Sequence, residues 1–296
     1  MLLILFVGII SISLSAIFIR LCFPMPPVSI AVFRLGIASF ILFLIALFKG
    51  CKVRFRRREM FLMSMGGFFL ALHLITWIAS LDYTSVANSV ALVTTNPVFV
   101  GIFSVLFSKR RMEKEIIIGI ILSVLGSFLV SRGYAGEAYH TSHLLGDVLA
   151  LMGAMFASGY IIVGGIVREK VDTFEYILFT YSVTFVILFI VSFPLGFTFY
   201  RGKPLFFGFP FRSYVFVFLL AIVSQLIGHT SFNYSLKFLK PDFVAITILG
   251  EPVGASLFAY CLFGERISFI QLLGMVLIFF AVIVASKKAS LNEVID

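Results

Sequence analysis

Long apolar runs, each close to the length of a membrane-spanning helix, alternate with short polar segments along this chain. A helix needs about 20 apolar residues to cross the hydrocarbon core of a bilayer, within a range of roughly 17 to 25. Because the segments between the runs are mostly short, we expect consecutive helices to be antiparallel neighbours. The ten predicted spans are Leu2–Leu21, Val28–Phe48, Met60–Ser80, Val86–Phe107, Ile116–Ser131, Leu144–Val167, Phe174–Gly196, Ser213–Ser235, Phe243–Phe263 and Ser268–Ser286.

The composition agrees with this pattern. Of the 296 residues, 61% are hydrophobic and only 12% are charged, and the mean hydropathy is +1.12. Soluble domains carry about 25% charged residues, which they need to cover their surface. The sequence therefore excludes a soluble enzyme, a nucleic-acid-binding protein and a disordered chain, and it predicts an all-α integral membrane protein. Three cysteines, none paired by its position, argue against a disulfide framework.

The net charge of +9 is best read segment by segment, because lysine and arginine gather in cytoplasmic loops and set the orientation of membrane proteins. If the N-terminus is cytoplasmic, sixteen of the 23 lysine and arginine residues fall on the cytoplasmic side, six fall outside, and Arg34 lies within a span. The bias is strong in the first half of the chain and weak in the second. It predicts that both termini are cytoplasmic.

An internal repeat appears when the chain is aligned with itself at an offset of 155 residues. The run Asn96-Pro97-Val98 then meets Glu251-Pro252-Val253, and Gly119 meets Gly274, with no gap from the third to the fifth span. We interpret residues 1–135 and 144–289 as two five-span repeats. Since five is odd, the second repeat enters the membrane inverted. Inverted repeats are typical of transporters, with the binding site near the midplane between the halves.

The residues of this repeat also resemble a known family. The runs that carry the resemblance are Val32-Phe33-Arg34-Leu35, Thr84–Ser89 leading to Thr95–Phe99, Leu249–Val253, and Phe263–Ser268. They are similar to those of the drug/metabolite transporter superfamily, in its ten-helix group built from two EamA-type repeats. The first repeat departs from the pattern, because Ser108–Arg111 stands where the family often has Gly-Glu-Arg. The resemblance implies a carrier of small metabolites, often amino acids or related compounds and frequently an exporter, in a bacterial or archaeal inner membrane.

Several predicted spans carry polar residues at intervals that place them on one helical face. An ionisable or strongly polar side chain within a bilayer is costly and usually faces the protein interior. We expect these faces to converge on a central substrate site. The candidate substrate-binding residues are His73, Trp77, Asn88, Thr95, Gln225, His229, Asn233 and Thr247. The alternatives left open are structural: the histidines as neutral hydrogen-bonding groups, Trp77 as an interfacial anchor, and Arg34 either as a carboxylate ligand or as a side chain reaching the headgroups.

The dipeptide Glu251-Pro252 is the most distinctive single feature. A proline within a helix lacks the backbone N–H and leaves a carbonyl free, so Pro252 and Pro97 are expected to break their spans. Broken helices of this kind line substrate or ion pathways in transporters. Glu251 is therefore the candidate ion-coupling residue. The alternative is a protonated Glu251 that only fixes helix packing.

These observations predict a secondary transporter that moves a small polar organic metabolite, in the direction of export, by alternating access with proton coupling. The chain has no phosphate-binding loop of the ATPase type. We expect no cofactor and no metal, since His140 and His143 lack convincing partners. Membrane lipids and protons are the other expected partners, with a monomer or a homodimer as the working unit. The alternatives are an uncoupled facilitator or channel and, with least support, an intramembrane enzyme.

Overall fold

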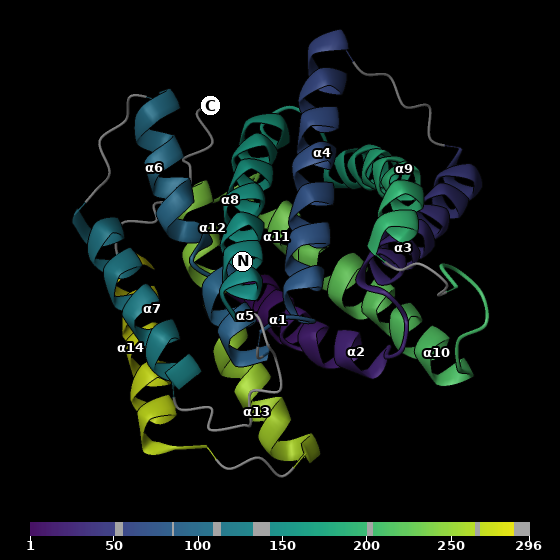
Figure 1. The fold of residues 1–296 in the computed structure, drawn as a ribbon. Coiled ribbons are helices and arrows are strands. Elements are labelled where there is room, and N and C mark those ends of the chain that lie inside the picture. The colour runs from purple at the N-terminus through teal and green to yellow at the C-terminus, as the bar shows by residue number, and fades with distance from the viewer. Residues whose placement is uncertain are drawn as a thin grey trace.

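A computed structural model describes residues 1–50, 56–84, 86–108, 114–132, 143–199, 204–263 and 267–286 of the chain. Within these ranges the secondary structure is entirely helical (Figure 1). The elements are α1 (Leu2–Ser13), α2 (Ser15–Leu21), α3 (Pro27–Lys49), α4 (Arg57–Ser80), α5 (Val86–Val93), α6 (Asn96–Ser108), α7 (Lys114–Arg132), α8 (His143–Arg168), α9 (Thr173–Phe199), α10 (Phe211–Leu219), the π-helix η1 (Leu220–His229), α11 (Thr230–Ser235), α12 (Pro241–Ile248), α13 (Glu251–Phe263) and α14 (Phe269–Ser286).

Each of the ten predicted apolar segments contains helix over most of its described residues. In the described part of the chain, seven helical stretches are long and apolar enough to cross a membrane, and Ser89–Phe103 and Phe269–Val284 are shorter apolar helices. The chain is therefore a multi-pass membrane protein. The fifth predicted segment begins at Lys114, two residues earlier than its apolar run. Four segments are not single regular helices, since α1 and α2, α5 and α6, and α12 and α13 are separate elements and η1 interrupts α10 and α11.

The helix bounds repeat along the chain. The break between α5 and α6, at residues 94 and 95, lies 155 residues before the break between α12 and α13, at residues 249 and 250. Their neighbours repeat as well: α8 packs against α4 and α6, while α1 packs against η1, α11 and α13. In the same way α5 contacts α7 and α13, and α12 contacts α14 and α6. The two halves therefore share both the local breaks and the pattern of helix contacts.

Two of the contacts between the halves pair repeat-equivalent helices. Helices α3 and α9 form one of these pairs. Helices α7 and α14 form the second; they pack along much of their length and lie at the left of the molecule in Figure 1. Glycine makes the second contact possible. A Cβ on Gly126 would lie 2.7 Å from the carbonyl oxygen of Gly274. Small residues allow this close backbone approach in membrane proteins, where dispersion contacts replace the hydrophobic drive of water.

One large apolar core lies between the halves and includes Leu35, Leu70, Trp77 and Leu220. The outer surface is also apolar: Phe43, Phe197 and many other large hydrophobic side chains are exposed. In water such a surface would aggregate. It suits a chain whose outer face contacts lipid.

Candidate functional site

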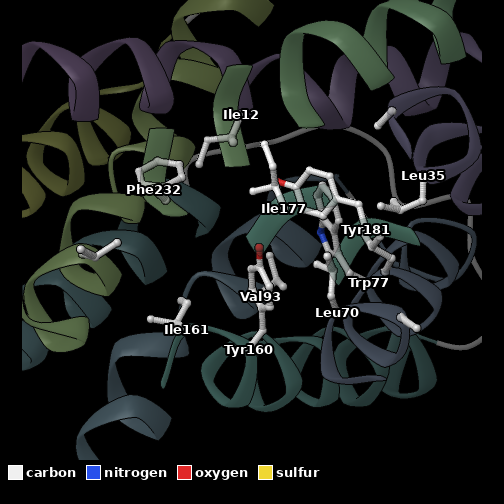
Figure 2. Packing of buried hydrophobic residues seen from close by; sticks show 14 of the residues in the cluster. Ile12, Leu35, Leu70, Trp77, Val93, Tyr160, Ile161, Ile177, Tyr181 and Phe232 are labelled. Carbon is white, nitrogen blue, oxygen red and sulfur yellow. The ribbon is translucent and has the colours of Figure 1, made fainter. Parts of the chain in front are cut away.

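A narrow cavity of about 60 Å³ lies at the centre of the helix bundle. Its wall is apolar over most of its area, and polar groups enter from several helices. The lining residues are Ile12, Ser15, His73, Trp77, Val93, Thr94, Asn96, Ala157, Tyr160, Ile161, His229, Phe232, Asn233, Leu236, Ile248 and Glu251. They come from both halves of the chain. Figure 2 shows part of this wall, with Trp77, Tyr160, Val93 and Phe232 around the same interior space.

Both helix breaks open onto this cavity. The chain leaves α5 at Thr94 and Thr95 and starts α6 at Asn96, and it leaves α12 at Leu249 and Gly250 and starts α13 at Glu251. Each proline is the second residue of the new helix, where its missing N–H costs nothing. The residue before each proline, Asn96 or Glu251, lines the cavity. The breaks thus bring two repeat-equivalent polar residues to the centre of the protein.

A serine from a neighbouring helix braces each break. The Ser158 hydroxyl on α8 donates a hydrogen bond of 2.9 Å to the carbonyl oxygen of Asn96. On the other side, the Ser13 hydroxyl on α1 donates one of 3.3 Å to the carbonyl oxygen of Glu251. Backbone groups freed from a helix inside a membrane need such partners, because no bulk water reaches them.

Aromatic rings form one wall of the cavity. The His73 and Trp77 rings are stacked, with centroids 5.8 Å apart and an interplanar angle of 9°, and the His229 ring lies 6.4 Å from that of His73. His73 Nδ1 is 3.0 Å from the carbonyl oxygen of Gly153. Since a carbonyl oxygen only accepts, Nδ1 carries the proton, and Nε2 of the neutral ring is left as an acceptor. Trp77 is buried in the protein and is not an interfacial anchor.

A hydrogen-bonded cluster forms the next part of the wall. The amide of Asn233 lies 2.6 Å (Nδ2) and 2.8 Å (Oδ1) from the Tyr160 hydroxyl. Its Nδ2 also donates to the Tyr181 hydroxyl at 3.1 Å. In Figure 2 Tyr160 and Tyr181 approach the interior space from different sides. Two polar atoms of the lining have no hydrogen-bond partner among the described residues, the acceptor Asn96 Oδ1 and the donor Trp77 Nε1.

Arg34 on α3 is fully buried and does not extend to the headgroup region. Its Nε donates a hydrogen bond of 2.8 Å to Gln225 Oε1 on η1. Of the two interpretations of Arg34, the one in which its side chain reaches the lipid headgroups is therefore wrong. The reason is tertiary: α9, α4 and η1 pack around α3 and enclose the guanidinium.

The structure brings five of the nine predicted substrate-binding and coupling residues to the cavity: His73, Trp77, His229, Asn233 and Glu251. Three others do not line it. Gln225 faces Arg34, while the hydroxyls of Thr95 and Thr247 donate to Leu92 and Val244 within their own helices.

The remaining predicted positions fall outside the described part of the chain. They are the side chain of Asn88 and the loops at 109–111 and 264–266.

The misplaced residues have physical explanations. Face spacing assumes a regular α-helix, but η1 closes its hydrogen bonds over five residues and so takes about one more residue per turn. This changes the direction of Gln225 relative to Asn233. At the first break, the chain turns between Thr94 and Asn96, so Thr94 enters the cavity and Thr95 does not.

The cavity wall also contains Tyr160, Thr94 and Asn96, which were not among the residues predicted from the sequence. Asn96 carried a usable signal, since it is the repeat partner of Glu251. Tyr160 carried a weaker one, a hydroxyl in the middle of an apolar helix. Ser15, expected to contribute a small polar group, does line the cavity. Among the searched residues, no three His, Cys, Asp or Glu side chains gather as metal ligands would.

Comparison with known proteins places this architecture in a family. An uncharacterized transporter of Archaeoglobus fulgidus is 25% identical over 74% of this chain and 74% of its own length. The pseudopaline exporter CntI of Pseudomonas aeruginosa is 23% identical over 54% of each chain. A solved crystal structure with 17% identity superposes with a TM-score of 0.77 over 97% of this chain and 96% of that one, which shows a shared fold.

The sequence profile of the EamA-like transporter family matches residues 1–132 and again residues 144–287, nearly the whole chain. These matches indicate a transporter rather than an enzyme. The chain belongs to the EamA-like transporter family of the drug/metabolite transporter superfamily.

Proposed function

We propose that this protein is a secondary transporter that moves a small polar organic metabolite across the cytoplasmic membrane by alternating access. One observation carries the proposal: both helix breaks, one from each half of the chain, meet at a single central cavity. Broken helices around a central site are how transporters expose polar groups to a substrate without exposing backbone to lipid. The unpaired Asn96 Oδ1 and Trp77 Nε1 are suited to polar groups of such a substrate.

We further propose ten membrane crossings arranged as two inverted five-helix repeats, residues 1–135 and 144–289. The 155-residue offset in helix bounds and the matching helix contacts support this arrangement. Rocking of one half against the other around the cavity is the natural motion of such a fold. The α3–α9 and α7–α14 contacts are the surfaces at which the halves would slide.

Both termini are assigned to the cytoplasm by the distribution of lysine and arginine. The cavity lies within one chain, so a monomer is sufficient for transport, and a homodimer would place two such cavities side by side. Export is the proposed direction, because a relative is named as an exporter of a metabolite.

Substrate contacts are assigned first to the residues at the cavity wall, His73, Trp77, His229 and Asn233. The other residues expected from the sequence act further out: Gln225 behind the wall, Thr95 and Thr247 at the breaks. Glu251 is the proposed proton site. It is 7% exposed and lines the cavity together with His73 and His229, and the charge of Arg34 acts on it.

The test is flux into and out of proteoliposomes that contain the purified protein. A panel of amino acids, nucleosides and amphipathic metabolites is screened first by thermal stabilisation, and each hit is then assayed with and without a pH gradient. Gradient-stimulated flux supports the proton-coupled carrier. Flux that ignores the gradient supports the alternative, an uncoupled facilitator or channel. If no solute of the panel crosses faster than in empty liposomes, the proposal fails.

A further inference from the structure

Three buried nitrogen atoms of Arg34 and Gln225 have no hydrogen-bond acceptor among the described residues. The Arg34 side chain is 0% exposed and uses Nε on Gln225 Oε1 at 2.8 Å. Among the described residues, Arg34 Nη1, Arg34 Nη2 and Gln225 Nε2 form no hydrogen bond. Arg34 and Gln225 therefore form a cluster of hydrogen-bond donors that lack an acceptor among the described residues.

Such a cluster is costly in a membrane protein. A buried charge is retained when it is paired and hydrogen-bonded. In the described part of the chain no carboxylate lies within 4.0 Å of the guanidinium, and the ion pair found there is the surface contact between Lys237 and Asp172. The missing partner has a definite chemistry: a planar, anionic, two-oxygen acceptor, which a guanidinium binds in bidentate fashion.

The cluster stands next to the cavity. Gln225 lies one turn before His229 on η1, and His229 lines the wall. The Thr230 hydroxyl donates to the Gln225 backbone carbonyl at 3.5 Å and lies 3.5 Å from the Tyr181 hydroxyl. That hydroxyl accepts from the cavity residue Asn233. The charge of Arg34 acts on His73, His229 and Glu251, all of which face the cavity. A substrate in the cavity is thus separated from Arg34 by a layer of side chains that an alternating-access motion rearranges.

We propose that Arg34 and Gln225 form the carboxylate-binding subsite of this transporter, so that its substrate is a small organic acid or zwitterion. This inference rests on the proposed transport function and narrows its substrate class. The carboxylate receives Arg34 Nη1 and Nη2 and Gln225 Nε2. The remainder of the substrate contacts the ring wall of His73 and Trp77. A neutral or purely cationic solute leaves the guanidinium uncompensated and binds poorly.

The test uses pairs of probes that differ only in the carboxylate. Phenylacetate is paired with phenylacetamide, and L-phenylalanine with L-phenylalaninamide, alongside short aliphatic acids and their amides. Trp77 is the sole tryptophan of the chain and lines the cavity. Its fluorescence in lipid nanodiscs therefore reports binding directly, and thermal stabilisation gives a second readout.

The wild type is expected to bind at least one acid about 30-fold or more tightly than its amide, and Arg34→Gln to abolish this preference while leaving amide binding unchanged. Arg34→Lys restores part of it, because a lysine keeps the charge without the bidentate geometry. Arg20→Gln, at an exposed arginine of α2, is the matched control and keeps the preference. Equal binding of acids and amides, no response to any acid, or an unchanged preference in Arg34→Gln overturns the proposal.

A second variant keeps the test sharp if Arg34→Gln does not fold. Gln225→Glu is nearly isosteric and places a carboxylate within the chain beside Arg34. It is expected to raise the melting temperature of the ligand-free protein and to remove the preference for acids, because the site is already filled. A Gln225→Glu protein that still prefers acids as strongly as the wild type contradicts the subsite.

Binding and transport also separate the two proposals. If acids bind through Arg34 and no probe crosses the membrane, the subsite stands and the transport function fails. If neutral solutes are transported equally well by wild type and Arg34→Gln while acids are ignored, the transporter stands and the subsite fails.

Discussion

The hydroxyl of Ser13 on α1 donates a hydrogen bond to the carbonyl oxygen of Glu251 on α13, and Ser158 on α8 does the same to Asn96 on α6. Each hydroxyl also lies within hydrogen-bonding distance of the carbonyl oxygen four residues earlier in its own helix, so the two carbonyls share its single proton. The two halves thus use the same device at equivalent breaks, but one break carries a carboxylate and the other an amide. Of the two breaks, the one in the second half carries the ionisable side chain.

Replacing either serine with alanine should loosen its helix break. Ser13→Ala and Ser158→Ala each remove one interhelical hydrogen bond and leave a buried carbonyl without that partner, so each should lower the free energy of unfolding by about 1 kcal/mol. Thermal unfolding in detergent measures the change. Ser231→Ala is the control, since the Ser231 hydroxyl bonds only to Ile227 on its own helical stretch. Equal melting temperatures for all three variants and the wild type would remove the bracing role.

Glu251→Gln should abolish the stimulation of transport by a pH gradient. Glutamine fills nearly the same volume and keeps hydrogen-bonding capacity, but it cannot take up or release a proton. Flux in proteoliposomes with and without the gradient measures the effect.

Glu169→Gln, at an exposed residue after α8, is the control and should remain gradient-sensitive. If Glu251→Gln transports as fast as the wild type with the same response to the gradient, Glu251 belongs to the packing of α13 and not to coupling.

His229→Ala should raise the apparent KM for the transported substrate roughly 3- to 10-fold, the effect of losing one hydrogen bond or ring contact. The His229 ring stands between those of His73 and Tyr160, with centroids at 6.4 and 6.5 Å. Concentration-dependent flux gives KM and maximal rate separately. An unchanged KM would show that His229 packs the interior without touching substrate.

Gly126→Ala should disrupt the contact between α7 and α14. The new Cβ would lie 2.7 Å from a backbone oxygen that cannot rotate away, and overpacking of this kind costs about 1–3 kcal/mol. Thermal unfolding and flux both report the damage. Gly66→Ala is the matched control, since its nearest neighbours lie at an ordinary contact distance of 3.4 Å. If the two variants melt at the same temperature, the helices are not closely packed at Gly126.

Much of the fold could be predicted from the sequence, because hydrophobic length is a local property. A bilayer requires apolar helices of a certain length, and the runs of the chain show where they begin and end. The same is true of the breaks: Pro97 and Pro252 each remove a backbone hydrogen bond from a helix and so favour a break there. The 155-residue repeat, read from the Asn96 and Glu251 segments, reappears in the helix bounds of α5, α6, α12 and α13.

The composition of the site was decided by tertiary packing. Spacing on a helix shows which residues share a face, but it does not show which neighbour that face meets. Because of the π-helix η1, Gln225 does not share the direction of Asn233. Its side chain accepts a hydrogen bond from Arg34 instead. The packing of α8 places the Tyr160 hydroxyl beside Asn233 in the cavity wall, although no sequence motif predicted a role for Tyr160.

Arg34 is the clearest case. In the sequence its position allowed either a headgroup contact or a ligand role, since a long side chain can reach in both directions. The helices that pack around α3 bury the guanidinium and so exclude the headgroup contact. The sequence determined by itself that the chain crosses a membrane, that its halves repeat and where the helices break, because these follow from local hydrophobicity and backbone chemistry. Which polar groups meet in the centre depended on contacts between helices far apart in the chain, and only the tertiary structure decided it.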